Sequence, residues 1–148
     1  MNSTRNPLNI KQPSEGQHWQ GAELTNDAGT EIFASEIWAI RAAFISLTRK
    51  WHNNKTTIQA IVNDWAPADD TQGSIAGNPP NDPVDYANYV AKAVGCSPLQ
   101  ALSSPEDTPH LWAVIIRAMS IFETSEPCDW DIIFGGISKA LIYLRNAS

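Results

Sequence analysis

Residues 111–122, with the sequence LWAVIIRAMSIF, form the most apolar run of the chain and decide its fold class. Thr108 and Pro109 precede the run as a helix start, and Pro127 follows it as a helix stop. Because the run is apolar on nearly every side, it predicts a helix at the centre of the fold that the other helices surround.

A carboxylate, Glu123, follows directly after this apolar run. A carboxylic acid at the edge of an apolar interior has a raised pKa, because burial disfavours its charged form. Such a group keeps its proton close to neutral pH and can act as a general acid. The alternative is a glutamate that is solvated or that caps the helix end.

Four further helices are predicted by apolar residues that recur every three or four positions. Serine, threonine or aspartate stands where these helices begin, and glycine, asparagine or proline stands where they end. The predicted helices cover about residues 35–52, 56–66, 82–94 and 129–145, and a short helical turn is expected after Pro98. The pair Gly135 and Gly136 in the last helix predicts a close contact with a neighbouring helix.

Two short extended pieces, at residues 18–19 and 31–33, predict a small β-hairpin ahead of the first helix. The expected fold class is therefore mainly α, with about five to six helices around one central buried helix and a small β-hairpin. A chain of 148 residues with 43% hydrophobic residues is large enough for one domain with its own core. We expect this single domain to span residues 1–148.

The charge of the chain limits its partners. The net charge is −6, and the ten Lys and Arg residues are scattered along the sequence without a basic run, which argues against nucleic acid. Six tryptophans are many for this length. Tryptophan rings either stack on sugars in a cleft or pack in the core.

No secretory signal is expected, because residues 1–10 are polar, and no stretch approaches the ~20 apolar residues of a membrane span. Cys96, Cys128 and the three histidines lack the spacing of a metal site, so we predict neither a metal nor a cofactor. The two cysteines are expected to be free thiols, with a disulfide between them as the alternative.

Several short segments occur in the order in which a known family carries similar motifs. Over residues 5–137 the chain resembles phage virion-associated murein-degrading proteins, whose fold is lysozyme-like. Where that family has a His-Glu-Asn-Gly motif, this chain has Glu123 with Phe122, Thr124 and Ser125 as neighbours. The matching segments are NPLNI at 6–10, WQG at 19–21, Phe33, AIRA at 39–42, TI at 57–58, IV at 61–62, WAP at 65–67 and ND at 81–82.

Two features are also similar to motifs of lytic transglycosylases. Glu followed by Thr or Ser at the end of an apolar helix resembles their catalytic acid, and DYANYV at residues 85–90 resembles their Tyr-Val motif. In those enzymes the Glu precedes the Tyr, whereas here Glu123 follows Tyr89. The resemblance therefore implies a circularly permuted order, which a compact fold with neighbouring termini permits.

The resemblance implies that the chain cleaves peptidoglycan glycan strands with Glu123 as the general acid. Tyr89 would then orient the sugar or hydrogen-bond Glu123, and the alternative is a core tyrosine on a helix face. Asn6 and Asn9 would bind sugar amides through their side chains, or they would make Asx turns.

Three more residues are assigned to substrate binding by the same resemblance. Thr124 and Ser125 would hold the carboxylate of Glu123, or they would cap the turn that follows it. Trp19 would line the saccharide cleft or pack against the core, whereas for Trp65 core packing is the preferred interpretation.

The number of catalytic carboxylates separates two reactions. Hydrolysis of a glycosidic bond by two carboxylates needs a second acid roughly 5 to 9.5 Å from the first. A lytic transglycosylase needs no second one, because the sugar's own 6-hydroxyl attacks and a 1,6-anhydro product forms. No motif selects a second carboxylate, which favours the lyase route; the candidates are Asp69, Asp70, Asp82 and Asp85.

Peptidoglycan glycan strands are the predicted substrate, and proteins of a phage particle are the other partners that the resemblance implies. The expected location is a phage virion or the bacterial periplasm after delivery. The alternative function is a non-catalytic structural or interaction module of a phage particle with a degenerate lysozyme-like fold. A hydrolase of the peptide cross-link is disfavoured, because neither a Cys-His pair nor a zinc motif is present.

Overall fold

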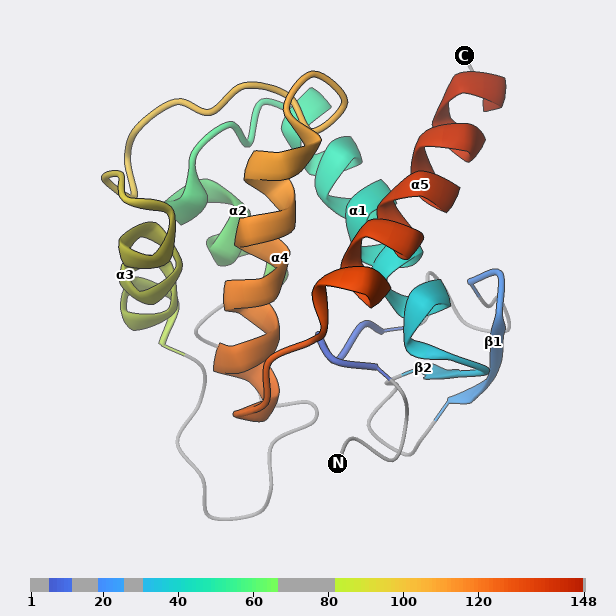
Figure 1. Cartoon of the computed structure of the whole chain (residues 1–148). Helices are drawn as coiled ribbons and strands as arrows, with labels where there is room; N and C mark the ends of the chain where they lie inside the picture. The colour runs from blue at the N-terminus through green and yellow to red at the C-terminus, as the bar shows by residue number, and fades with distance from the viewer. Residues whose placement is uncertain (1–5, 12–18, 26–30, 67–81, 148) are drawn as a thin grey trace.

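The computed structural model describes residues 6–11, 19–25, 31–66 and 82–147. These residues form two strands and five helices, so the fold is mainly α as predicted (Figure 1). The expectations that fall on His18, Pro67, Asp69 and Asp70 lie outside the described residues. The elements are β1 (Ala22–Thr25), β2 (Glu31–Phe33), α1 (Glu36–His52), α2 (Ile58–Trp65), α3 (Pro83–Val94), α4 (Pro109–Thr124) and α5 (Trp130–Ala147).

The ends of the helices follow the local signals in the sequence. The Thr57 side chain accepts the Ala60 N–H at the start of α2, and the Asp82 side chain accepts the Asp85 N–H at the start of α3. Gly95 ends α3 with a φ of +87°, a left-handed conformation that glycine adopts without steric cost. After Pro98 the chain makes a hydrogen-bonded turn, and no helix forms there.

All five helices contribute to one hydrophobic core, but its most buried helix is α1 and not α4. Every residue from 39 to 45 is buried, so α1 is enclosed on all sides in this stretch. Helix α4 packs against α3 on one side and against α1 and α5 on the other. Residues 111–122 thus form a helix that is buried or partly buried throughout, as predicted, but α4 is not the fully surrounded centre of the fold. One face of α4, spaced like a helix face, is only partly buried and consists of Leu111, Val114, Arg117 and Ile121.

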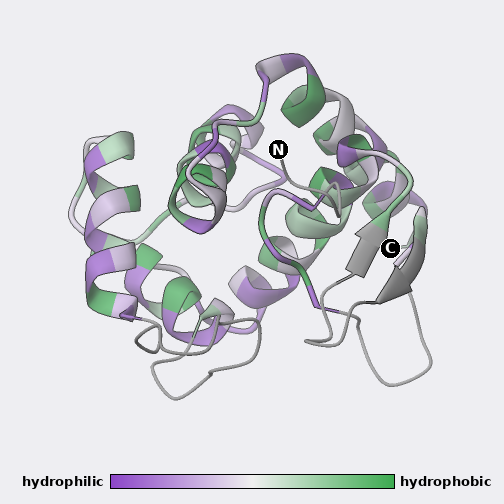
Figure 2. Ribbon diagram, turned by 90° about the horizontal axis from the view of Figure 1, so that it is seen from below, coloured by the Kyte–Doolittle hydropathy of each residue, from purple (hydrophilic) through white to green (hydrophobic). Residues whose placement is uncertain are grey.

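Helix α1 is more enclosed than α4 because several of its side chains are small. Ala39, Ala42 and Ala43 lie in the buried stretch of α1, where small residues let neighbouring helices approach closely. Each helix carries both hydrophobic and hydrophilic residues, as helices that bury one face do (Figure 2).

The two strands pair in an antiparallel sheet, with Ala22 opposite Phe33 and an irregularity between Ala22 and Leu24. Strand β2 coincides with the predicted piece at 31–33, whereas β1 begins three residues beyond Trp19. The turn into β1 needs glycine at position 21, where φ is +84° and a Cβ would overlap the Trp38 side chain.

The predicted close helix contact at the glycine pair is confirmed. A Cβ at Gly136 would lie 2.5 Å from Ile40 Cβ and 2.8 Å from the backbone oxygen of Ile37, both on α1. A Cβ at Gly135 would lie 3.6 Å from its nearest neighbour, Ile37 Cδ1, which is an ordinary contact. Gly136 therefore lets α5 lie directly on the backbone of α1.

Gly136→Ala should destabilise the protein by about 1–3 kcal/mol, because the added methyl group forces α5 away from α1. Gly135→Ala is the matched control, and it should be neutral or stabilise by about 0.5–1 kcal/mol, because alanine is the better helix former. Urea unfolding followed by circular dichroism measures both. Equal effects of the two substitutions would contradict the close contact at Gly136.

Candidate functional site

Glu123 lies in the last turn of α4, which short-range hydrogen bonds hold in place. The Thr124 hydroxyl donates to the backbone oxygen of Ser120 at 2.8 Å, and Ser120 Oγ accepts the Cys128 N–H at 3.3 Å. Ser125 ends the helix in the left-handed region with a φ of +64°. Thr124 and Ser125 thus cap the helix end, and within the described part of the chain neither side chain bonds the Glu123 carboxylate.

Three uncharged donors from three separate segments converge on the Glu123 carboxylate. Oε2 accepts the Tyr86 hydroxyl of α3 at 3.1 Å and Nε1–H of Trp65, the last residue of α2, at 3.2 Å. Oε1 accepts Nδ2–H of Asn9 at a longer 3.4 Å. Glu123 itself is partly exposed. The carboxylate is therefore a junction of the N-terminal segment, α2, α3 and α4.

Asn6 and Asn9 have different roles in the N-terminal segment. Asn6 is fully buried; its side chain donates to Ile10 O and accepts Ile10 N–H, both at 2.9 Å. The Asn6 side chain therefore braces the turn at residues 6–10 by bonding a residue four positions on, and not two as in an Asx turn, and its buried amide is not exposed to a substrate. Asn9 is exposed with a φ of +52°, and the turn that Asn6 closes presents its amide to Glu123.

The burial of Glu123 shifts its protonation. Burial raises the pKa of Glu123 above the ordinary 4.5, and this effect exceeds the opposing hydrogen bonds from Asn9, Tyr86 and Trp65 and the charge of Lys11. Burial and the neighbouring carboxylate together raise the pKa of Tyr86 well above its usual range, so its hydroxyl stays protonated and donates. The raised pKa expected from the sequence is thus a property of the site.

The geometry also determines which oxygen carries the proton of the acid. Oε2 is occupied by two donors, and the Trp65 N–H has no acceptor capacity. The proton of neutral Glu123 therefore belongs on Oε1, next to the exposed Asn9.

Tyr86, and not Tyr89, hydrogen-bonds Glu123. The two tyrosines lie three residues apart on α3, and both rings contact Phe122: Tyr86 is stacked at 4.2 Å between centroids, and Tyr89 is tilted at 5.6 Å. Tyr86 is 2% exposed, whereas Tyr89 is 40% exposed. Tyr89 therefore lies outside the carboxylate's hydrogen bonds, with its ring available to a bound molecule. The i, i+3 spacing places both on one face, so spacing alone does not choose between them.

Both candidate tryptophans pack against the core, and within the described residues only Trp65 reaches the carboxylate. Trp65, expected to be a packing residue, packs against the core and donates to Glu123. Trp19 donates Nε1–H to the backbone oxygen of Lys11 at 3.2 Å, and the Arg49 guanidinium lies 5.7 Å from its ring. The described contacts of Trp19 thus place it beside α1, and none of them is with Glu123.

Two of the candidate second carboxylates lie at the start of α3. Asp82 caps that helix, and Asp85 is exposed in its first turn. Neither has a described hydrogen bond with Glu123.

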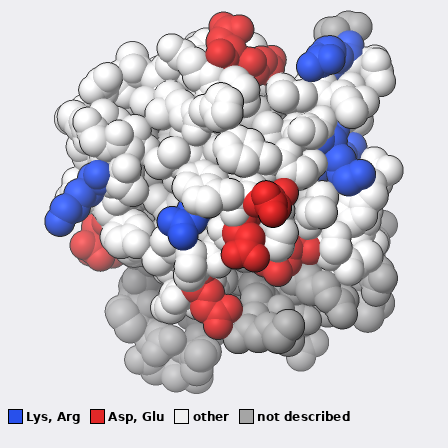
Figure 3. Space-filling model, viewed as in Figure 1, with Lys and Arg blue, Asp and Glu red and all other residues white. Residues whose placement is uncertain are grey.

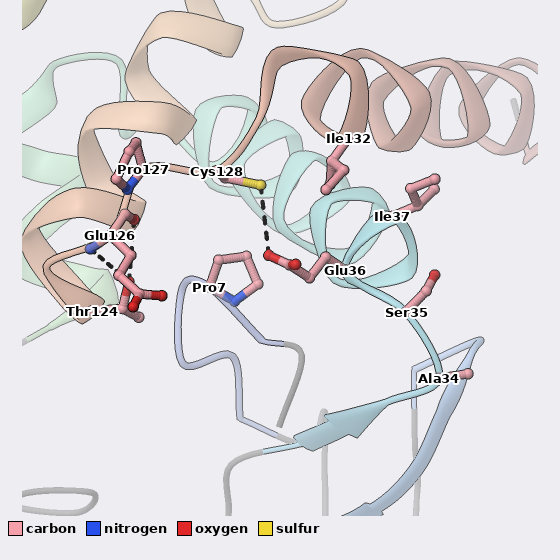
Figure 4. A pocket seen from close by; sticks show the side chains of 10 residues that line it. All are labelled: Pro7, Ala34, Ser35, Glu36, Ile37, Thr124, Glu126, Pro127, Cys128 and Ile132. Atoms are coloured by element: carbon pink, nitrogen blue, oxygen red, sulfur yellow. Dashed lines mark hydrogen bonds between the residues drawn. The ribbon is translucent and has the colours of Figure 1, made fainter. Parts of the chain in front are cut away.

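A pocket of about 340 Å³ adjoins the end of α4 and is lined by Thr124, the residue after Glu123. Figure 4 shows the start of α1 on one side of it, the segment after α4 on the other, and Pro7 between them. In its wall the Cys128 thiol donates to Glu36 Oε2 at 3.9 Å. Burial and the nearby carboxylates raise the pKa of Cys128 to about 12, so this thiol is not a nucleophile at neutral pH.

The structure agrees with the expected free thiols, since Cys96 and Cys128 are unpaired. Within the described ranges, no three His, Cys, Asp or Glu side chains come together in a way that would hold a metal ion. The helices in the described part of the chain are too short or too polar to cross a membrane. Neither the protein-family models nor the curated protein sequences contain a match to this chain.

Glu123→Gln should change how stability depends on pH. Because the folded-state pKa of Glu123 is raised, the stability of the wild-type protein does not depend on this group below pH 4.5, where Glu123 is protonated in both the folded and the unfolded state. The wild-type protein then loses stability as the pH rises from 4.5 through the folded pKa. The variant lacks this loss, so the difference in unfolding free energy between the variant and the wild type should grow over that window and then level off. Urea unfolding across the pH range measures it; a difference independent of pH would contradict the raised pKa.

Tyr86→Phe should destabilise the protein by roughly 1 kcal/mol in acid and roughly 2 kcal/mol in mild alkali, because the lost hydrogen bond is stronger to a charged acceptor. Tyr89→Phe is the matched control and should change stability by less than about 0.5 kcal/mol, because that hydroxyl is on an exposed residue. Parallel denaturant titrations compare them. A larger loss for Tyr89→Phe would mean that the wrong tyrosine has been assigned to the carboxylate.

Proposed function

We propose that this protein cleaves the β-1,4 glycosidic bonds of peptidoglycan glycan strands, with Glu123 as the general acid. The observation that carries the proposal is the Glu123 carboxyl group. It has a pKa raised by burial, its Oε2 is fixed by two donors, and its Oε1 lies beside the exposed Asn9. A poised acid at a partly exposed position is what protonation of a glycosidic oxygen requires.

The chemistry needs one proton to move out and one to return. Glu123 Oε1 gives its proton to the leaving glycosidic oxygen as the bond to the anomeric carbon breaks. The resulting carboxylate is stabilised by the donors Asn9, Trp65 and Tyr86. It then takes a proton from the attacking hydroxyl, which belongs to water in a hydrolase or to the sugar's own 6-position in a lytic transglycosylase.

The contacts of Glu123 favour the route with one carboxylate. All three of its described hydrogen-bond donors are uncharged, and the aspartates described near α3 are a helix cap and an exposed residue. A lyase uses the same carboxylate first as an acid and then as a base, so it needs no second one. We therefore place the lytic transglycosylase ahead of the muramidase.

Two exposed side chains are placed to contact a sugar at Glu123. Asn9 lies directly on the carboxylate, and its amide can also bond the acetamido group of a glycan. Tyr89 presents a 40% exposed ring beside Phe122, the residue before the acid. A sugar bound between them would have its glycosidic oxygen near Oε1. Trp19 would line the saccharide cleft, as predicted, only if the bound glycan extended from Glu123 toward α1.

A phage virion or the bacterial periplasm is the setting in which we place this activity, on the resemblance of the sequence alone. Delivery by a particle would also remove the need for strong attraction to an anionic wall, which a net charge of −6 opposes.

A non-catalytic module with the same fold is the second candidate. Thr124 and Ser125 favour it, because they stand where the resembling family has other residues and they bond the helix end in place of the carboxylate. In that case Glu123 would serve only to join four segments of the fold.

Glu123→Gln should lower the release of soluble muropeptides from purified peptidoglycan by about 10²- to 10⁴-fold, because the amide has no proton to give. Glu106→Gln is the matched control, since Glu106 is exposed and pairs with His52. Mass spectrometry of the products separates the reactions, because a 1,6-anhydro product is lighter than a hydrolysis product by one water. Equal release by both variants would leave the non-catalytic module as the better account.

A further inference from the structure

Helices α1 and α5 carry basic residues almost without acidic ones. Their only acidic residues, Glu36 and Asp131, lie in the first turn of each helix. Beyond those turns, residues 37–52 contain three Lys or Arg, residues 132–147 contain two, and neither range contains Asp or Glu. The chain as a whole has 16 acidic and ten basic residues. Half of the ten Lys and Arg residues, although far apart in the sequence, therefore lie on two helices that pack against each other.

Arg41, at the centre of this region, is a buried cation with no anionic partner among the described residues. It is 5% exposed, and its described contacts are with aromatic rings: its guanidinium lies 4.8 Å from the Tyr143 ring centre and 5.9 Å from that of Trp38. No carboxylate described in the structure pairs with it. Burial lowers the pKa of Arg41; the interaction with Tyr143 opposes this effect, and the like charge of Arg49 adds to it.

Two neighbouring cations, Arg49 and Lys139, also contact aromatic side chains. Arg49 donates to the Tyr143 hydroxyl at 3.5 Å, and Lys139 lies 4.8 Å from the Trp38 ring centre. Both are exposed, and Tyr143 is 39% exposed. An aromatic ring attracts a cation through its quadrupole but carries no net charge. Within the described part of the chain, no carboxylate therefore compensates the positive charges of Arg41, Arg49 and Lys139.

Burying a guanidinium without an anion is costly, and a second guanidinium beside it increases the cost. An anion at this position would remove both penalties. Tyr143 contacts both arginines, and since its oxygen already accepts from Arg49, its own O–H remains to donate. Two arginines of α1 and a tyrosine of α5 thus lie close together, and two of the three residues, Arg49 and Tyr143, are exposed.

We propose that Arg41, Arg49 and Tyr143 form a binding site for a phosphate group, with Lys139 at its edge. Arginine forks match the oxygens of phosphate, and a phosphate offers acceptors to donors from two helices where a carboxylate has only two oxygens. On the face drawn in Figure 3, some Lys and Arg side chains lie at the right edge, over α5, and others lie at the left edge and near the acidic side chains at the lower centre.

The phosphate would come from one of two sources, a phosphodiester polymer attached to the bacterial wall or a free phosphate monoester. Neither source requires catalysis by Glu123, so the site stands independently of the proposed function.

The test measures phosphate affinity by isothermal titration calorimetry with inorganic phosphate and with a soluble poly(glycerol phosphate), both at constant ionic strength. Arg49→Gln should weaken binding of both probes by roughly 10- to 100-fold, because a charge-assisted hydrogen bond is lost. Lys92→Gln, which makes the same change in net charge on α3, should retain the wild-type affinity. Tighter binding of the polymer per phosphate would identify the wall polymer as the source, and equal binding would identify the free monoester.

Arg41→Met serves as a second variant, with circular dichroism to establish that it folds. It should lose phosphate binding and keep its helices, because an apolar side chain of similar length replaces a buried unpaired charge. The proposal is overturned if wild-type protein binds neither probe, or if Arg49→Gln and Lys92→Gln bind phosphate equally well. Glu123→Gln should leave the affinity unchanged.

Discussion

The burial of the Glu123 carboxyl group is the physical constraint on which the candidate site depends. Glu123 ends an apolar helix, and its oxygens are reached by side chains from the N-terminal turn, from α2 and from α3. A buried carboxylate without such donors would be expensive, so the three donors are a condition of placing it there. The same burial still leaves its pKa above the ordinary value. The desolvation of Glu123 thus accounts both for its raised pKa and for the need to bring donors from three other segments to its carboxylate.

Local signals predicted the parts of the fold that local interactions determine. The capping side chain of Asp82 and the left-handed Gly95 set the ends of α3 where the sequence predicted them, whereas Thr57 caps α2 one residue after the start predicted at residue 56. The glycine pair in α5 predicted a close contact because only hydrogen fits against Ile40. The edge of an apolar run was also sufficient to predict a raised pKa for Glu123, since burial depends on the flanking residues.

Features that depend on tertiary geometry were missed. Tyr86 and Tyr89 share a face of α3, and only the orientation of that helix decides which hydroxyl reaches the acid. Trp65 has the apolar spacing of a core residue, and nothing local reveals that its N–H meets a carboxylate. Arg41 and Tyr143 are about a hundred positions apart, so their contact becomes visible only when α5 lies on α1.

The pKa of Glu123 measured directly in the folded protein tests the central claim best. A ¹³C NMR titration of the labelled side-chain carboxyl group, assigned by its absence in Glu123→Gln, reports the protonation of this one group. The account predicts a midpoint clearly above 4.5, because desolvation exceeds the hydrogen bonds that oppose it. A midpoint at or below 4.5 would show that the donors dominate, and Glu123 would then be an ionised structural carboxylate and not a poised acid.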